Sequence, residues 1–162
     1  AGRLRIKPQE LLSQIDRMQE QLKAKEKATQ VLEEKLALAQ AGELLTKAEI
    51  VGDCKLVLGQ VKDVTADALK TLADHLRKNA DNIIVVLACV QAADKVSLVA
   101  GVSDKLVKTG INAGKLVKEA ATVCGGSGGG KPELAQAGGK DPSRVDAALA
   151  AVRDQLKQAS AT

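Results

Sequence analysis

The chain has 162 residues with a formal net charge of +4 and contains no Phe, Tyr or Trp. Without aromatic rings it cannot offer the stacking surfaces on which sequence-tolerant binding of single-stranded nucleic acid depends. The charge permits a polyanionic partner without requiring one, and the length predicts one domain with an appendage, or two small units.

The first element that the pattern predicts is a long helix over residues 8–47, in which apolar residues recur at alternating spacings of four and three. The repeated positions are Leu11, Ile15, Met18, Leu22, Lys25, Thr29, Leu32, Leu36 and Ala39. Seven of these nine are apolar, and so narrow a stripe favours a coiled coil over a helix buried in a globular core. We therefore expect residues 1–47 to form a coiled-coil oligomerisation segment that makes a dimer.

The predicted seam consists of Leu11, Ile15, Met18, Leu22, Leu32 and Leu36. Lys25 and Thr29 weaken its middle, so a short helical hairpin is an alternative, as is a single amphipathic helix packed on its own domain. Gly42 marks an interruption near the end of the helix.

After Thr46 the pattern changes to short runs of branched residues. Residues 48–51 and 54–61, separated by Gly52-Asp53, predict a β-hairpin. Thr65 is a good N-cap for a helix with one apolar stripe. The stripe consists of Leu69, Leu72, Ala73 and Leu76. His75 falls beside it with no partner acid or nucleophile, which predicts a surface histidine.

The nearly continuous apolar run 82–90 predicts a central strand covered on both faces, and a turn leads from it into a paired strand at 95–102. A short helix at 103–108 follows. Asn112 then caps a helix whose stripe is Leu116, Val117, Ala120 and Val123. Asp141-Pro142 starts the last helix, with the stripe Val145, Leu149, Val152 and Leu156. Residues 48–162 are thus expected to form one α+β domain with a small, mainly antiparallel sheet and helices packed on it.

Seven of the sixteen residues in CGGSGGGKPELAQAGG (124–139) are glycine. A P-loop is excluded because Lys131 is followed by Pro132 and not by Ser or Thr. A dinucleotide fingerprint should follow a strand, whereas this tract follows a predicted helix. The ordered pattern at 135–139 argues against a disordered linker. We expect a glycine-rich loop at 125–139 that either passes close to another backbone or points several amides at an anion.

Lysines gather before and around this tract. Lys105, Lys108, Lys115 and Lys118 fall within fifteen residues, and Lys131 and Lys140 flank the tract. Such a run is either a solvated helix face or a basic surface that binds phosphates. Its position beside the glycine tract favours the phosphate-binding surface. Gln136 can donate and accept toward a ribose or base edge, or it satisfies neighbouring backbone. The predicted RNA-binding residues are Lys131, Gln136, Lys140, Lys105, Lys108, Lys115, Lys118, Gly128, Gly129 and Gly130.

No constellation of catalytic or metal-binding residues is found. Cys54, Cys89 and Cys124 are odd in number and far apart, which predicts buried reduced thiols in a reducing compartment. The sequence contains no run of about twenty apolar residues, so no membrane-spanning helix is predicted. The chain starts at Ala1 and enters charged sequence directly, so we expect it to be a piece of a longer protein.

Three segments carry a family resemblance: KPQELLSQIDRMQEQL, KVSLVAGVSDKLVKTGINAGKLVKEAA and CGGSGGGKPELAQAGGKDPSRVDAALAAVRDQL. In this order they resemble the C-terminal region of bacterial-type alanyl-tRNA synthetases over essentially the whole chain. GGGKPELAQAGG is the most specific element, and KVSLVAGV followed by AGKLVKEAA is a second match.

The resemblance implies charging and editing domains elsewhere in a parent alanine–tRNA ligase, which uses ATP with Mg and often Zn there. It implies a helical oligomer-forming segment here, followed by a globular domain that is related to the accessory domain of DHH-type phosphoesterases and holds the outer corner of tRNA. The chain has no Asp-His-His triplet, so phosphoesterase chemistry is not inherited. Those relatives have Gly-Gly-Gly-His where this chain has Gly128-Gly129-Gly130-Lys131, which replaces a titratable ring with a cation.

We therefore expect a cytoplasmic, non-catalytic module without cofactors, which binds tRNA and promotes oligomerisation. Its partners would be tRNA, a second copy and the other domains of the same synthetase. The alternative is a purely structural dimerisation module without nucleic-acid contact. Binding of DNA or a protein stays open.

Overall fold

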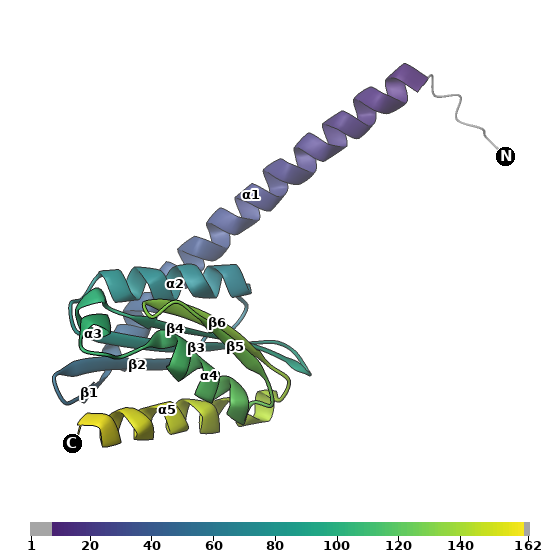
Figure 1. Cartoon of the computed structure of the whole chain (residues 1–162). Coiled ribbons are helices and arrows are strands. Elements are labelled where there is room, and N and C mark those ends of the chain that lie inside the picture. Colours follow the sequence, from purple (N-terminus) through teal and green to yellow (C-terminus); the bar gives the residue numbers. More distant parts are fainter. Residues whose placement is uncertain (1–7, 161–162) are drawn as a thin grey trace.

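The computed structural model of the chain describes residues 8–160, so residues 1–7 of the expected oligomerisation segment lie outside the described residues. A long helix projects from a body in which helices cover both faces of one sheet (Figure 1). In chain order the elements are α1 (Pro8–Thr46), β1 (Glu49–Val51), β2 (Cys54–Gln60), α2 (Ala66–Lys78), β3 (Ile83–Ala92), β4 (Lys95–Val102), α3 (Asp104–Lys108), α4 (Ala113–Val123), β5 (Ser127–Gly130), β6 (Leu134–Gly139), the 3₁₀ turn η1 (Pro142–Arg144) and α5 (Val145–Ser160).

Helix α1 is one continuous helix of 39 residues, roughly 60 Å long at the usual rise per residue. The helical-hairpin alternative is wrong, and Gly42 does not interrupt the helix. Its C-terminal part joins the body, where Ala41 and Leu44 are buried. Leu44 packs over Gly59 of β2, where a Cβ would overlap its side chain. The coiled coil stays a prediction.

The sheet has six strands in the order β1-β2-β3-β4-β6-β5. Antiparallel pairing joins β1 to β2, β3 to β4, β4 to β6 and β5 to β6, so the expected mainly antiparallel α+β fold and both predicted hairpins are confirmed. The parallel pairing of β2 and β3 was not predicted from the sequence. Helix α2 connects them, because parallel neighbours need a crossover long enough to return the chain.

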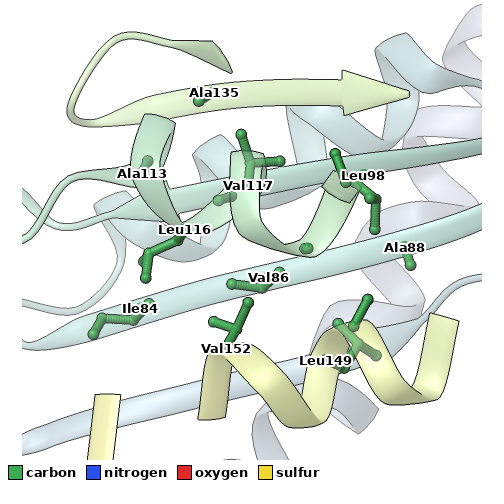
Figure 2. Packing of buried hydrophobic residues seen from close by; sticks show 14 of the residues in the cluster. Ile84, Val86, Ala88, Leu98, Ala113, Leu116, Val117, Ala135, Leu149 and Val152 are labelled. Atoms are coloured by element: carbon green, nitrogen blue, oxygen red, sulfur yellow. The ribbon is translucent and has the colours of Figure 1, made fainter. Parts of the chain in front are cut away.

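The predicted central strand 82–90 is confirmed as β3, which is buried over Ile83–Cys89. Its side chains alternate between two cores. Ile84, Val86 and Ala88 point toward α4 and α5 (Figure 2), while Val85 and Leu87 pack with α2 and the end of α1. Each core is built from aliphatic side chains, as a chain without aromatics requires.

The predicted caps of α2 and α4 are confirmed. The Thr65 hydroxyl accepts a hydrogen bond from the amide of Ala68, and the side-chain oxygen Oδ1 of Asn112 accepts one from the amide of Lys115, both at 3.3 Å. Asp141 caps the 3₁₀ turn η1 instead of α5 itself, because Pro142 starts a tighter turn that ends where α5 begins. His75 is exposed, as predicted.

The expected loop at 125–139 is wrong, because the tract forms the hairpin β5–β6, which extends the sheet beyond β4. Glycine has little intrinsic strand preference, so the pairing of β6 with β4 and of β5 with β6 decides the conformation. No anion-binding nest of alternating dihedrals is present, since Gly125 alone in this tract has a positive φ. The close-approach interpretation is confirmed. A Cβ at Gly128 would overlap the Ala137 methyl and lie 2.7 Å from the Gln136 carbonyl oxygen.

Candidate nucleic-acid interface

The β5–β6 turn is tied to its neighbours by backbone hydrogen bonds. The amide of Lys131 donates to the carbonyl of Leu134 at 3.1 Å, which closes the turn. The amide of Ala113 at the start of α4 donates to the carbonyl of Pro132 at 2.8 Å, and that of Val102 at the end of β4 donates to Glu133 at 2.9 Å. The turn is therefore held by α4 and β4, while the Lys131 side chain remains exposed.

A groove of about 410 Å³ lies between α2 and this hairpin. Its lining consists of Lys70, Arg77, Gly129, Gly130, Lys131, Glu133, Leu134, Ala135 and Gln136. Gly129 and Gln136 face each other in the β5–β6 register, and both are exposed. The groove therefore has a helix with cationic side chains on one side and a glycine-rich strand pair on the other.

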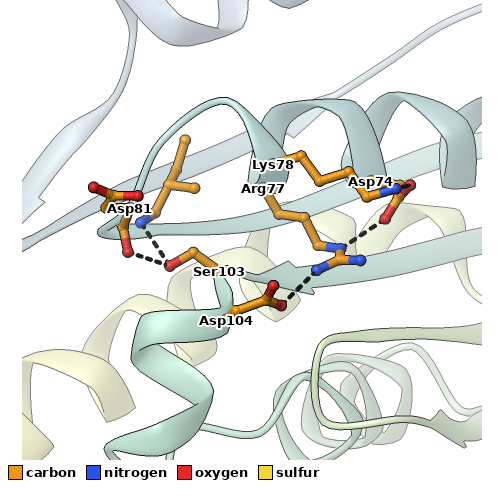
Figure 3. Close-up of polar contacts among 7 residues, drawn as sticks. Asp74, Arg77, Lys78, Asp81, Ser103 and Asp104 are labelled. Carbon is orange, nitrogen blue, oxygen red and sulfur yellow. Dashed lines mark hydrogen bonds and ion pairs between the residues drawn. The ribbon is translucent and has the colours of Figure 1, made fainter.

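Arg77 is already bound by carboxylates. Its Nε donates to Asp74 Oδ1 at 2.7 Å and its Nη1 to Asp104 Oδ1 at 3.1 Å, which ties α2 to α3 (Figure 3). Lys78 Nζ lies 2.6 Å from the other Asp74 oxygen. Burial raises the pKa of Asp74, but the hydrogen bonds from Lys78 and Arg77 outweigh it and lower the pKa below its ordinary value.

Two cationic side chains of the groove are available to bind a ligand. Lys70 and Lys131 are exposed and form no ion pair with any side chain that the structure describes. Glu133 is the carboxylate of the lining and opposes them in part. The balance of Lys70 and Lys131 against Glu133 leaves the groove positive, because the charge of Arg77 is offset by Asp74 and Asp104.

The structure brings some of the predicted residues together. Lys131, Gln136, Gly129 and Gly130 line the groove, whereas Gly128 belongs to β5 outside its lining. The side chain of Gln136 makes no hydrogen bond with any other described residue, which contradicts the interpretation that it satisfies neighbouring backbone.

The other predicted lysines lie on separate elements. Lys105 and Lys108 on α3 and Lys115 and Lys118 on α4 are exposed. Helix α4 starts beside the hairpin turn, through the hydrogen bond from the Ala113 amide to the Pro132 carbonyl, whereas α3 is joined to α2 by the Arg77–Asp104 ion pair. None of these four lysines lines the groove, and α4 packs on the face of the sheet opposite α2.

Lys140 does not share a site with Lys131. The six residues of β6 separate them, a distance of roughly 20 Å at the usual rise of a strand. The amide of Lys140 donates to the carbonyl of Cys124 at the end of α4. The expectation of two lysines bracketing one loop is corrected, because an extended hairpin places its ends far apart.

Lys70 and Arg77 line the groove but were not predicted from the sequence. They are seven residues apart in α2, which puts them on one side of the helix, and this spacing was the signal that could have found them. The spacing alone does not place that side against residues 129–136, since the contact depends on the crossover from β2 to β3.

The seam residues of α1 are all exposed, from Ile15 at 41% to Met18 at 69%. The set is Leu11, Ile15, Met18, Leu22, Leu32 and Leu36. None of them belongs to the buried clusters, to which α1 contributes Ala41 and Leu44. The projecting part of α1 therefore presents uncovered apolar side chains.

Cys54, Cys89 and Cys124 are free thiols, the last two buried, and burial raises the pKa of each. Between Pro8 and Ser160 no three His, Cys, Asp or Glu residues gather where they could hold a metal ion. No helix in that range is long and apolar enough to cross a membrane.

Residues 53–158 match the DHHA1 domain family. The chain is 43% identical over 161 residues to an alanine–tRNA ligase of Nostoc punctiforme, and the match covers 99% of the chain and 18% of that relative. An alanine–tRNA ligase of Bacillus thuringiensis is 38% identical over 160 residues, again with 99% and 18% covered. The chain thus spans less than a fifth of the length of these relatives.

Among solved structures, the fold is similar to the C-Ala domain from Aquifex aeolicus alanyl-tRNA synthetase. The TM-score is 0.64 at 34% sequence identity, and the match covers 68% of this chain and 97% of that one. Both comparisons agree with the resemblance that the glycine-rich segment carries.

Proposed function

Because this chain belongs to the alanyl-tRNA synthetases and has the C-Ala fold with its DHHA1 domain, we propose that it binds tRNA through the β5–β6 hairpin and catalyses no reaction itself. The other domains of the same synthetase are its proposed partners in the cytoplasm. The ATP, Mg and Zn of the parent family are assigned to those domains, and none to this chain.

One observation carries the proposal: the groove between α2 and the hairpin holds two lysines that no described carboxylate binds. Lysines that pair with nothing else are available to phosphates. The exposed lysines on α3 and α4 extend this positive surface around the turn. Since the chain has no aromatic ring, we infer recognition of folded RNA by shape, phosphate and 2′-hydroxyl contacts, for which stacking is not needed.

The test is tRNA affinity at two salt concentrations for the parent chain and for Lys131→Ala. Neutralising five or six phosphates should reduce the parent's affinity by roughly two to three decades over a fourfold rise in salt. Lys131→Ala should weaken binding and should reduce the slope of log affinity against log salt concentration by about one. Lys62→Ala removes an exposed lysine far from the groove and is the matched control. Equal affinities and slopes for Lys131→Ala and the parent would contradict the proposal for this residue.

The proposed contact is the outer corner of tRNA. Intact tRNA should bind more tightly than an isolated acceptor stem, because the stem lacks that corner. A preference for the stem would place the contact elsewhere.

A second function is favoured by the uncovered seam on α1, because contiguous exposed apolar side chains mark interaction surfaces. We infer that two copies associate through it. Sedimentation should show a concentration-dependent dimer that Leu22→Glu disrupts. Leu12→Glu, on an exposed leucine outside the seam, should leave the dimer intact. A chain that stays monomeric at all concentrations would contradict this role and leave the RNA proposal standing.

A further inference from the structure

Gly129 is a glycine that the protein itself does not require. At Gly128 and Gly130 a Cβ would collide with β6, against Ala137 in the first case and 2.7 Å from the Ala135 Cα in the second. At Gly129 a Cβ would meet no heavy atom within 4 Å, and the residue does not have a positive φ. Glycine weakens a strand, and one inside a strand often marks a close approach by a ligand or another backbone.

The open space above Gly129 belongs to the groove. Gly129 pairs with Gln136 across the hairpin, and both line the groove that Lys70 and Lys131 also line. Since paired residues of an antiparallel ladder share one face of the sheet, the missing side chain leaves the amide of Gln136 uncovered. That amide has no partner among the described residues.

We propose that the groove is a subsite for one phosphate–ribose unit of RNA, whose backbone lies against Gly129. Lys70 and Lys131 attract the phosphate from the two sides of the groove. The Gln136 amide, which donates and accepts, binds the ribose 2′-hydroxyl. This inference rests on the proposed RNA-binding function and specifies its chemistry.

The lining favours this occupant over a nucleobase. It contains no aromatic ring on which a base could stack. Its third cation, Arg77, is held by Asp74 and Asp104, so it shapes the wall of the groove. Glu133 repels a second phosphate, which limits the subsite to one unit.

The experiment compares Gly129→Ala with Gly138→Ala in the full chain. Gly138 is also exposed on the hairpin, and a Cβ there would lie 3.9 Å from the nearest atom, outside the groove. Both variants should melt within a few degrees of the parent. Gly129→Ala should lower tRNA affinity about fivefold or more, since the methyl occupies the ligand's space, whereas Gly138→Ala should not.

A second arm tests the ribose contact with an RNA hairpin and a DNA hairpin of the same sequence. Gln136→Ala should reduce the preference for RNA over DNA, because only RNA offers the 2′-hydroxyl. Lys70→Gln should weaken binding of the RNA hairpin and of the DNA hairpin by a similar factor. This variant tests the phosphate contact even where Gly129→Ala fails to fold. Parent-like affinity and RNA preference in Gly129→Ala and Gln136→Ala would overturn the subsite while the parent still binds tRNA. Failure of the parent to bind tRNA would overturn the proposed function as well.

Discussion

The hydroxyl of Thr65 donates a hydrogen bond to Glu33 Oε2 across 3.0 Å, while it accepts one from the amide of Ala68. The residue that caps α2 therefore also holds α1. A carboxylate at this place interacts favourably with the positive end of α2. This hydrogen bond and the packing of Leu44 of α1 on Gly59 of β2 attach α1 to the body at two points. The two points together set the direction in which the helix projects.

Thr65→Ala should destabilise the protein by about 1 kcal/mol, because it removes the helix cap and the contact to Glu33. Thr65→Ser keeps a hydroxyl that can make both hydrogen bonds and should remain close to the parent. Urea unfolding followed by circular dichroism measures the difference. Equal midpoints for the alanine and serine variants would contradict the role assigned to this hydroxyl.

Leu44→Ala should cost about 2 kcal/mol, the lower end of the range for a buried leucine, since the site lies at the margin of the core. The smaller side chain leaves a gap above Gly59, over which Leu44 packs. Leu45→Ala is the matched control, because Leu45 is 42% exposed. Thermal unfolding of the two variants should separate them clearly, and similar losses of stability would show that the end of α1 is not anchored as described.

Gly128→Ala should destabilise the hairpin by about 1–3 kcal/mol, because the new methyl would overlap Ala137 and forces the strands apart. Amide hydrogen exchange should be accelerated in β5 and β6 before it is in β3. Retained protection in this variant would mean that the close approach of the two backbones does not limit the residue type.

Asp74→Asn should lower stability at neutral pH by about 1 kcal/mol, since it removes the charge that binds Arg77 and Lys78. The pKa of Asp74 is lowered in the folded protein. The stabilisation that Asp74 provides is therefore complete above the pKa of this carboxyl in the unfolded chain, about 4. It is lost as the pH falls through the lower pKa that the carboxyl has in the folded protein. Unfolding free energies of the parent and the variant should converge on acidification. A difference that stays constant with pH would contradict this assignment.

The three thiols should react slowly with a thiol reagent at pH 8, because burial raises the pKa of each and only the thiolate reacts. Cys54 is partly exposed and should be labelled first, ahead of the buried Cys89 and Cys124. Mass spectrometry of the labelled chain gives the order, and denaturant should abolish the differences. Faster labelling of Cys89 than of Cys54 would indicate local opening of the core around β3.

The local pattern of the sequence was sufficient for most of the elements. The caps at Thr65 and Asn112, the apolar run of β3 and the turn at Gly52 follow from short-range preferences and hydrogen bonds between near neighbours. Lys131 and Gln136 could be selected for the same reason, since their chemistry and their place in a recognisable segment are visible without a fold.

By itself, then, the sequence determined the helices, the two early hairpins and the chemical character of the site. Only the tertiary structure decided that residues 127–130 and 134–139 are strands, because their glycines become extended by pairing, β6 with β4 and β5 with β6, and not through their own preference. It also decided that Lys70 faces Lys131 and that Lys140 does not, since both relations depend on the sheet order. The physical reason is that a pattern of side chains specifies local conformation, while the meeting of distant segments depends on which strand edges and apolar faces bury one another.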